Sequence, residues 1–320
     1  MNMRVATGDG FGPGFARFWK RSYASDYVGI MILLLAYMAV QFFMEPFHRM
    51  FFLDNLAIQY PHAEIERVSV PWLFLYTLAL PLLSLLLWIL LTRPPPHKSH
   101  TTLLGLPIAL LLSSFLTNII KNSVGRPRPD LIARCKPAPG TPSNTLVSWT
   151  VCTETDHHTL HDGWRSFPSG HSSFAFSGLG YLSLVLAGQF KVFRPRTDFA
   201  KVLLTLVPLI GAALIAISRC EDYRHDVYDV TVGSLLGFFV AHFSYRRYYP
   251  SLRSSRCDTP YPPPGQEEEE GKKVGGRGSG SGSGSGRDEE EMVEGARQFE
   301  IGDEESDVEL EPLTAGGARS

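Results

Sequence analysis

Long apolar runs alternate with polar connections between residues 27 and 248, and each run is close to the roughly 20 residues that a helix needs to cross a bilayer. The second run, PWLFLYTLALPLLSLLLWILL, is the clearest, because its two prolines are tolerated in a membrane helix but argue against a soluble helical core. The last run is the weakest, since it is short and begins beside Asp226 and Asp229. The pattern predicts an all-α integral membrane protein with six transmembrane helices, at residues 27–44, 70–91, 101–120, 172–190, 199–217 and 228–245.

The polar segments on either side of these runs divide the chain into three parts. Residues 1–26 form a polar N-terminal segment, residues 27–248 the six-span domain, and residues 249–320 a tail with YPPP, a run of glutamates, Gly-Ser repeats and acidic blocks. Such a composition buries no core, so the tail is predicted to be disordered. The net charge of −2 hides this division, because residues 1–257 are net positive and residues 258–320 strongly negative.

Six spans place both chain termini on the same side of the membrane. If the termini are cytoplasmic, the segments on the inside carry more Lys and Arg than those on the outside, which favours this orientation. The short connections at 93–99 and 191–198 then lie inside, and the longer ones at 45–69 and 121–171 lie outside. The outside is the cell exterior or the lumen of the endoplasmic reticulum, Golgi or vacuole, and the sequence leaves this choice open.

Four cysteines are too few for a disulfide scaffold and have no metal-ligand spacing. Cys135 and Cys152 fall in one outside loop, where both a disulfide and two free thiols fit the sequence.

The stretch from Ser218 to Asp229 is densely charged, although it lies between two strongly apolar runs. His225 and Asp229 are four residues apart, so on a helix they share one face, where the carboxylate can orient the imidazole. A His/Asp pair at this spacing is by itself more often structural. Its environment therefore decides how it is interpreted.

Two other polar clusters fall on the same outside face. One follows the third predicted span, from Lys121 to Pro129, and the other precedes the fourth, from Trp164 to His171. Ionisable residues at the membrane edge usually mark function. The span count therefore predicts that three clusters, distant in the sequence, meet at one surface.

The three clusters together suit a phosphate group. Lys121, Arg128 and Arg219 are cations, and arginine forks match phosphate oxygens. Ser169 and Gly170 stand where a loop turns into the fourth predicted helix, and backbone N–H groups at a helix start favour an anion.

Two histidines add the chemistry of phosphoryl transfer to this predicted phosphate site. One can attack phosphorus, and the other can protonate the leaving oxygen. His225 is the better nucleophile, because Asp229 can hold its other ring nitrogen, and His171 is then the acid. The sequence offers no carboxylate cluster suited to Mg²⁺ and no His/Cys set suited to Zn²⁺, so we predict no metal and no cofactor. Three cations suffice to neutralise the transition state.

At this point the chain resembles a known family, the type-2 phosphatidic acid phosphatase superfamily, whose members are also called lipid phosphate phosphatases and share a helical core with vanadium haloperoxidases. The family has three motifs: Lys, six residues, then Arg-Pro; Pro-Ser-Gly-His; and Ser-Arg, five residues, His, three residues, Asp. All three are complete here, as Lys121…Arg128-Pro129, Pro168-Ser169-Gly170-His171 and Ser218-Arg219…His225…Asp229. The context KNSVGRPRPDLIARC and GWRSFPSGHSS most closely resembles fungal diacylglycerol pyrophosphate phosphatases.

The resemblance covers about residues 27–248 and implies a phosphatase/haloperoxidase-like helical bundle. It implies a phosphohistidine intermediate on His225, with Asp229 as orienting partner and His171 as general acid. It also implies that the phosphate is held by five residues, which are Lys121, Arg128, Ser169, Gly170 and Arg219. The expected activity is Mg²⁺-independent removal of the terminal phosphate from diacylglycerol pyrophosphate, phosphatidate or lysophosphatidate. The expected partners are membrane lipid phosphates and no nucleic acid; the oligomeric state is open.

Alternatives remain at the level of substrate and class. The same motifs fit a phosphatase for polyisoprenoid pyrophosphates or sphingoid phosphates. A phospholipid-binding transporter or scaffold is disfavoured, because no internal repeat is evident and both histidines are present. Arg126, Arg165 and Arg224 are extra cations that either attract a second phosphate or contact lipid headgroups. For three acids near the motifs we favour a structural role, namely Asp130, Asp222 and Asp226.

Overall fold

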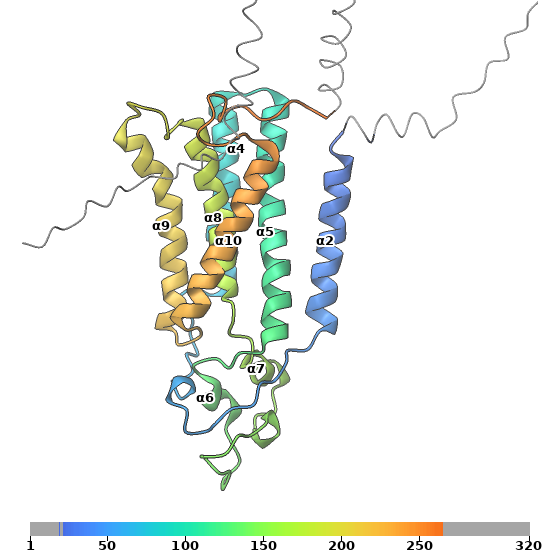
Figure 1. Ribbon diagram of the computed structural model, residues 1–320, viewed down its shortest axis with the longest axis vertical. Helices are drawn as coiled ribbons and strands as arrows, with labels where there is room; N and C mark the ends of the chain where they lie inside the picture. Colours follow the sequence, from blue (N-terminus) through green and yellow to red (C-terminus); the bar gives the residue numbers. More distant parts are fainter. Residues whose placement is uncertain (1–18, 20–21, 265–320) are drawn as a thin grey trace, which may run out of the picture. The chain divides into compact units, whose positions relative to one another are not determined.

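The computed structural model describes residue 19 and residues 22–264, and within that part every regular element is a helix. The described residues also form two isolated β-bridges, which pair Phe51 with Val147 and Pro137 with Cys152. The long helices run side by side (Figure 1). They are α2 (Ala24–Phe43), α5 (Pro96–Val124), α8 (Gly170–Gln189), α9 (Phe199–Glu221) and α10 (Val227–Tyr248). One further continuous rod is formed by α3 (Val70–Phe74), η2 (Leu75–Ala79) and α4 (Leu80–Thr92). The all-helical class predicted from the sequence is confirmed.

Five of these elements are long and apolar enough to cross a membrane, namely α2, the α3–η2–α4 rod, α5, α9 and α10. The prediction of six spans therefore goes one beyond what length and composition support. The segment in doubt is α8, and not the last one, α10, as the sequence suggested. A helix forms at α8 as predicted, but serine and glycine lower its hydropathy, and most of its side chains are buried against other helices. A helix surrounded by protein has less need of lipid-compatible residues.

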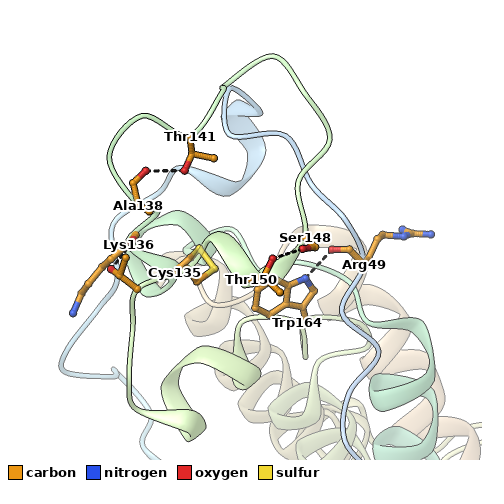
Figure 2. The surroundings of a disulfide bond; sticks show 10 residues. Arg49, Cys135, Lys136, Ala138, Thr141, Ser148, Thr150 and Trp164 are labelled. Carbon is orange, nitrogen blue, oxygen red and sulfur yellow. Dashed lines mark hydrogen bonds between the residues drawn. A yellow bond between two sulfur atoms is a disulfide. The ribbon is translucent and has the colours of Figure 1, made fainter.

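The two longer connections, residues 44–69 and 125–169, form a layer at one end of the bundle, which we call the cap. It contains four short helices (Figure 1), which are η1 (Leu56–Ile58), α6 (Leu131–Cys135), η3 (Trp149–Val151) and α7 (His157–Asp162). Cys135 and Cys152 are joined by a disulfide, so the structure favours the first of the two states that the sequence left open. Beside it, the Trp164 indole N–H donates to the carbonyl of Arg49 at 2.9 Å (Figure 2), which fastens one connection to the other.

The bundle is closest-packed where α8 meets α10. A Cβ on Gly233 would overlap the carbonyl oxygen of Ser169, and one on Gly237 would overlap that of Ser173. Two glycines four residues apart thus let the helix backbones approach, as is common between membrane helices. This contact brings the start of α8 against the first turns of α10.

The residues that directly follow α10 still pack against the helical bundle. Tyr249 and Cys257 are buried, and the Tyr261 backbone N–H donates to the carbonyl of Tyr248 at 2.9 Å. Residues 249–264 therefore pack on the bundle end opposite the cap, although we predict the tail to begin at residue 249. Most of the predicted tail, residues 265–320, lies outside the described residues, as does most of the predicted N-terminal segment.

Candidate active site

The three predicted clusters come together at the cap end of the bundle. Lys121 lies in the last turn of α5, Arg219 in the last turn of α9, and Asp229 in the first turn of α10. The backbone N–H of Ser169 donates to the carbonyl of Asp229 at 2.9 Å, which joins the start of α8 to α10. A Cβ added to Gly170 would lie 3.6 Å from Lys121 Nζ, so the end of α5 meets the same point.

Lys121 is the cation that the site leaves without a partner. Its side chain is buried, and within residues 22–264 its ammonium makes no hydrogen bond or ion pair. The ammonium lies beside Gly170 at the start of α8, where the helix dipole and the first-turn N–H groups also favour negative charge. This arrangement suits an incoming anion.

Arg128 is held in place by Asp162 of α7. Its Nε donates to the Asp162 carbonyl at 2.8 Å and its Nη2 to the Asp162 carboxylate at 2.9 Å. Burial alone would raise the pKa of Asp162, but the positive charges of Arg128 and Arg134 outweigh burial and keep the pKa well below its usual range. The carboxylate is therefore ionised, and it fixes the direction of the Arg128 guanidinium.

Arg219 is almost fully buried and is bound by carboxylates on two sides. Its Nη1 donates to Glu66 at 2.8 Å and its Nη2 to Asp222 at 2.5 Å, while Nε contacts the Ser218 hydroxyl at 3.4 Å. Glu66 comes from the cap and not from any of the three motifs. The arginine predicted to bind phosphate thus already holds an anionic group.

His225 is buried, and its ring nitrogen Nδ1 has no hydrogen-bond partner in the described chain. The distance from Nδ1 to Asp229 Oδ2 is 3.8 Å, longer than a hydrogen bond, although catalytic hydrogen bonds are often long before substrate binds. Burial, followed by the positive charges of Arg128 and Lys121, lowers the pKa of His225 well below its usual value. The imidazole is therefore neutral at neutral pH and has a free lone pair.

The Asp229 carboxylate is itself held by three donors. It accepts from Arg126 Nη1 at 2.7 Å, from the Ser166 hydroxyl at 2.6 Å and from the backbone N–H of Asp226 at 3.0 Å. Arg126 also pairs with the Asp226 carboxylate at 2.9 Å. Arg126 therefore holds the Asp229 carboxylate, and each of its two terminal nitrogens already pairs with a carboxylate.

Ser169 and His171 make contacts that shape the start of α8. The Ser169 hydroxyl is the helix cap, accepting from the backbone N–H and the hydroxyl of Ser172. His171 Nε2 lies 3.1 Å from the carbonyl oxygen of Val68 and 3.9 Å from Glu66. His171 therefore faces the same cap segment that supplies the carboxylate bound to Arg219.

A cavity of about 240 Å³ opens from this site between α2, α3, α5 and α8. Its polar end includes Lys121, Asp162, Arg165, Gly170 and His171. The rest of its lining combines Tyr37, Val70, Leu73, Phe74 and Phe174 with the polar residues Ser114, Thr117, Asn118 and Ser173. The cavity is thus charged where the motifs meet and has a mixed polar and apolar lining where it enters the bundle.

The partner carboxylates were not identified from the sequence. Asp162 and Glu66 stand in the cap, outside the motifs, and no spacing rule points to them. Of the extra cations, Arg224 is bound to Glu66 at 3.1 Å, whereas Arg165 lines the cavity. The structural role favoured for Asp130, Asp222 and Asp226 agrees with their contacts, since each pairs with an arginine: Arg134, Arg219 and Arg126 respectively.

The residues of the three motifs, from Lys121 to Asp229, fall inside a region that matches a known family. Residues 102–253 match the family described as the PAP2 superfamily. Diacylglycerol pyrophosphate phosphatase 1 of Saccharomyces cerevisiae is 43% identical over 227 residues, covering 70% of this chain and 78% of the yeast protein. The probable diacylglycerol pyrophosphate phosphatase 1 of Schizosaccharomyces pombe is 38% identical, covering 76% and 87%, and lipid phosphate phosphatase 2 of Arabidopsis thaliana is 36% identical, covering 74% and 78%. No solved structure gave a significant match.

Proposed function

Since this chain belongs to the PAP2 superfamily of lipid phosphate phosphatases, we propose that it removes the terminal phosphate from diacylglycerol pyrophosphate, phosphatidate and lysophosphatidate. The observation that carries this choice is the cavity, which holds Lys121 and His171 and is also lined by apolar side chains of membrane helices, such as Val70, Leu73 and Phe74. A phosphate joined to a hydrocarbon chain matches both the cationic and the apolar part of this lining, whereas a soluble sugar phosphate does not use the apolar part.

The reaction proceeds in two steps. A nitrogen of neutral His225 attacks the terminal phosphorus, the bond between phosphorus and the leaving oxygen breaks, and His171 donates a proton to that oxygen. A water molecule, deprotonated by His171, then attacks the phosphohistidine and releases inorganic phosphate. Lys121, Arg128 and Arg219 stabilise the charge on the phosphoryl oxygens, helped by the backbone of Ser169 and Gly170 at the start of α8. Asp229 stabilises the positive imidazole.

We place both termini in the cytoplasm and the site on the lumenal or extracellular face. The excess of Lys and Arg in the inside segments supports this orientation. The Cys135–Cys152 disulfide supports it too, because it lies in the cap, and disulfides persist in oxidising compartments. The vacuole, endoplasmic reticulum, Golgi and plasma membrane all satisfy these conditions.

The direct test is phosphate release by the purified protein across lipid substrates in mixed micelles, with and without EDTA. We expect release from diacylglycerol pyrophosphate, phosphatidate and lysophosphatidate, unchanged by EDTA, because protein cations neutralise the phosphoryl oxygens. Release confined to polyisoprenoid pyrophosphates or sphingoid phosphates would favour the alternative substrates. Binding of these lipids without any release would indicate a scaffold.

A second groove gives a test of the lipid part of the proposal. It has a volume of about 520 Å³ and lies between the α3–η2–α4 rod, α8 and α9. It begins at Val68, whose carbonyl contacts His171, and along α9 it extends from Leu204 to Ile215. Eleven helical steps span about 16 Å, roughly half of the ~30 Å hydrocarbon core, so the groove has the depth of one acyl chain in one leaflet.

Filling this groove should weaken only long-chain substrates. We expect Gly211→Leu to lower kcat/KM for long-chain phosphatidate about tenfold, the effect of displacing roughly two methylenes. A Cβ at Gly211 lies 3.8 Å from Leu179, an ordinary contact, so the leucine is accommodated and extends into the groove. The measurement compares long-chain phosphatidate with a water-soluble phosphomonoester, for which we expect no change. Gly29→Leu on α2, with open space around its Cβ, is the matched control; equal losses on both substrates would contradict the acyl-chain assignment.

A further inference from the structure

The segment from residue 60 to residue 68, which we call the strap, lies across the site and carries Glu66. It is held at both ends. The Tyr60 ring stacks on Tyr223 with centroids 4.7 Å apart, and the Tyr60 N–H donates to the Pro129 carbonyl at 3.0 Å. At the other end Arg67 Nε lies 3.1 Å from Glu221. The strap therefore joins two of the motif-bearing regions.

Glu66 is the point where the strap enters the anion site. Its Oε2 accepts from Arg219 at 2.8 Å and its Oε1 lies 3.1 Å from Arg224 Nη2, so two arginines bind the two oxygens of one carboxylate. The same Oε2 lies 3.9 Å from His171 Nε2. An oxygen that binds Arg219 and lies near His171 stands where the proposed reaction needs a phosphoryl oxygen.

Each of the three guanidinium nitrogens of Arg219 already donates to a partner, and Glu66 is the partner of Nη1. Asp222 and Ser218 occupy its other nitrogens, and both come from the same helix end as Arg219 itself. Asp222 is buried, and it also accepts the Arg67 N–H at 3.1 Å, so it belongs to the fixed framework. Glu66 is one-quarter exposed and belongs to a connection, which makes it the partner that can be displaced.

We propose that Glu66 holds the place of the substrate phosphate and must exchange with it before the reaction begins. The exchange explains why a carboxylate lies in a site for anions: Asp222 supplies one negative charge beside Arg219, and Glu66 supplies a second charge to Arg219 and Arg224 between turnovers, since unneutralised buried arginines are costly. It follows that Glu66 sets the affinity of the site for any phosphoryl group, whether in the lipid substrate or in the released phosphate. This inference rests on the proposed function, because it takes Arg219 as a phosphate ligand.

The test replaces Glu66 with glutamine, which removes the negative charge and keeps the shape of the side chain. We expect Glu66→Gln to bind inorganic phosphate about tenfold more tightly, as expected when one charge-assisted hydrogen bond no longer competes. Binding is measured as the rise in Tm with phosphate concentration, which needs no catalysis. For phosphatidate we expect KM to fall by a similar factor with no rise in kcat. Glu64→Gln, an exposed glutamate of the same strap, is the matched control and should leave both quantities unchanged.

The outcomes separate the competing roles. Unchanged phosphate affinity in Glu66→Gln overturns the exchange, and weaker binding overturns it too, because it would show that Glu66 positions Arg219. A fall in kcat at constant KM would assign proton transfer to Glu66 and also contradict the proposal. If Glu66→Gln folds poorly, Glu66→Asp, which withdraws the carboxylate, is expected to tighten phosphate binding in the same direction. A wild-type protein that binds phosphate but hydrolyses no lipid would refute the proposed function while the binding comparison still stands.

Discussion

Replacing His225 with alanine is expected to reduce phosphate release by at least about 10⁴-fold, because the reaction loses its nucleophile. The protein should still fold, since the buried Nδ1 of His225 has no hydrogen-bond partner in the described chain and its removal leaves no donor stranded. The measurement is phosphate release from phosphatidate at equal amounts of folded protein.

The control for this variant is His242→Ala, which removes an exposed histidine from α10, the helix that begins two residues after His225. Substantial activity in His225→Ala would refute the nucleophile assignment. The pH profile gives a second reading. Because burial and nearby cations lower the pKa of His225, the neutral imidazole persists as the pH falls, and the wild-type loss of activity on the acid side should lie below the usual histidine value of about 6.5. Loss centred above that value would contradict the environment described for His225.

Replacing Lys121 with methionine is expected to lower kcat/KM about 10²–10³-fold, the usual effect of removing one group that stabilises transition-state charge. The thermal stability should not fall together with the activity. The ammonium is buried without an ion pair in the described residues, so an apolar side chain of similar length should keep or raise the Tm. Activity and thermal unfolding, measured on the same preparation, test both signs.

Lys98→Met, at the opposite end of the same helix α5, is the control for Lys121 and should leave activity unchanged. A parallel fall of activity and Tm in Lys121→Met would show that the lysine supports the fold. Full activity with a raised Tm would exclude Lys121 from the phosphate site. Only a loss of activity with retained stability fits a cation kept for the substrate.

The proposed site residues could be brought together from the sequence because they lie at helix ends. Lys121, His171, Arg219 and Asp229 each stand at or within one turn of the place where an apolar run begins or ends, and counting spans is enough to put those ends on one face. The helical class follows in the same way, since a chain in lipid must satisfy its backbone within helices. These arguments use only neighbouring residues, or only whether the number of spans between two segments is odd or even.

The partners of the proposed site residues were decided by tertiary structure alone. Glu66 meets Arg219, Asp162 meets Arg128, and Arg126 meets Asp229. Each contact depends on how the cap folds over the bundle, and no residue spacing encodes that path. The hydropathy of the sequence also could not predict that α8 lies at the centre of the bundle, because a helix enclosed by protein does not need a lipid-facing surface. Composition and periodicity indicate whether a segment suits water, lipid or a protein interior. Only the packing of the folded chain determines which distant acid and base form an ion pair.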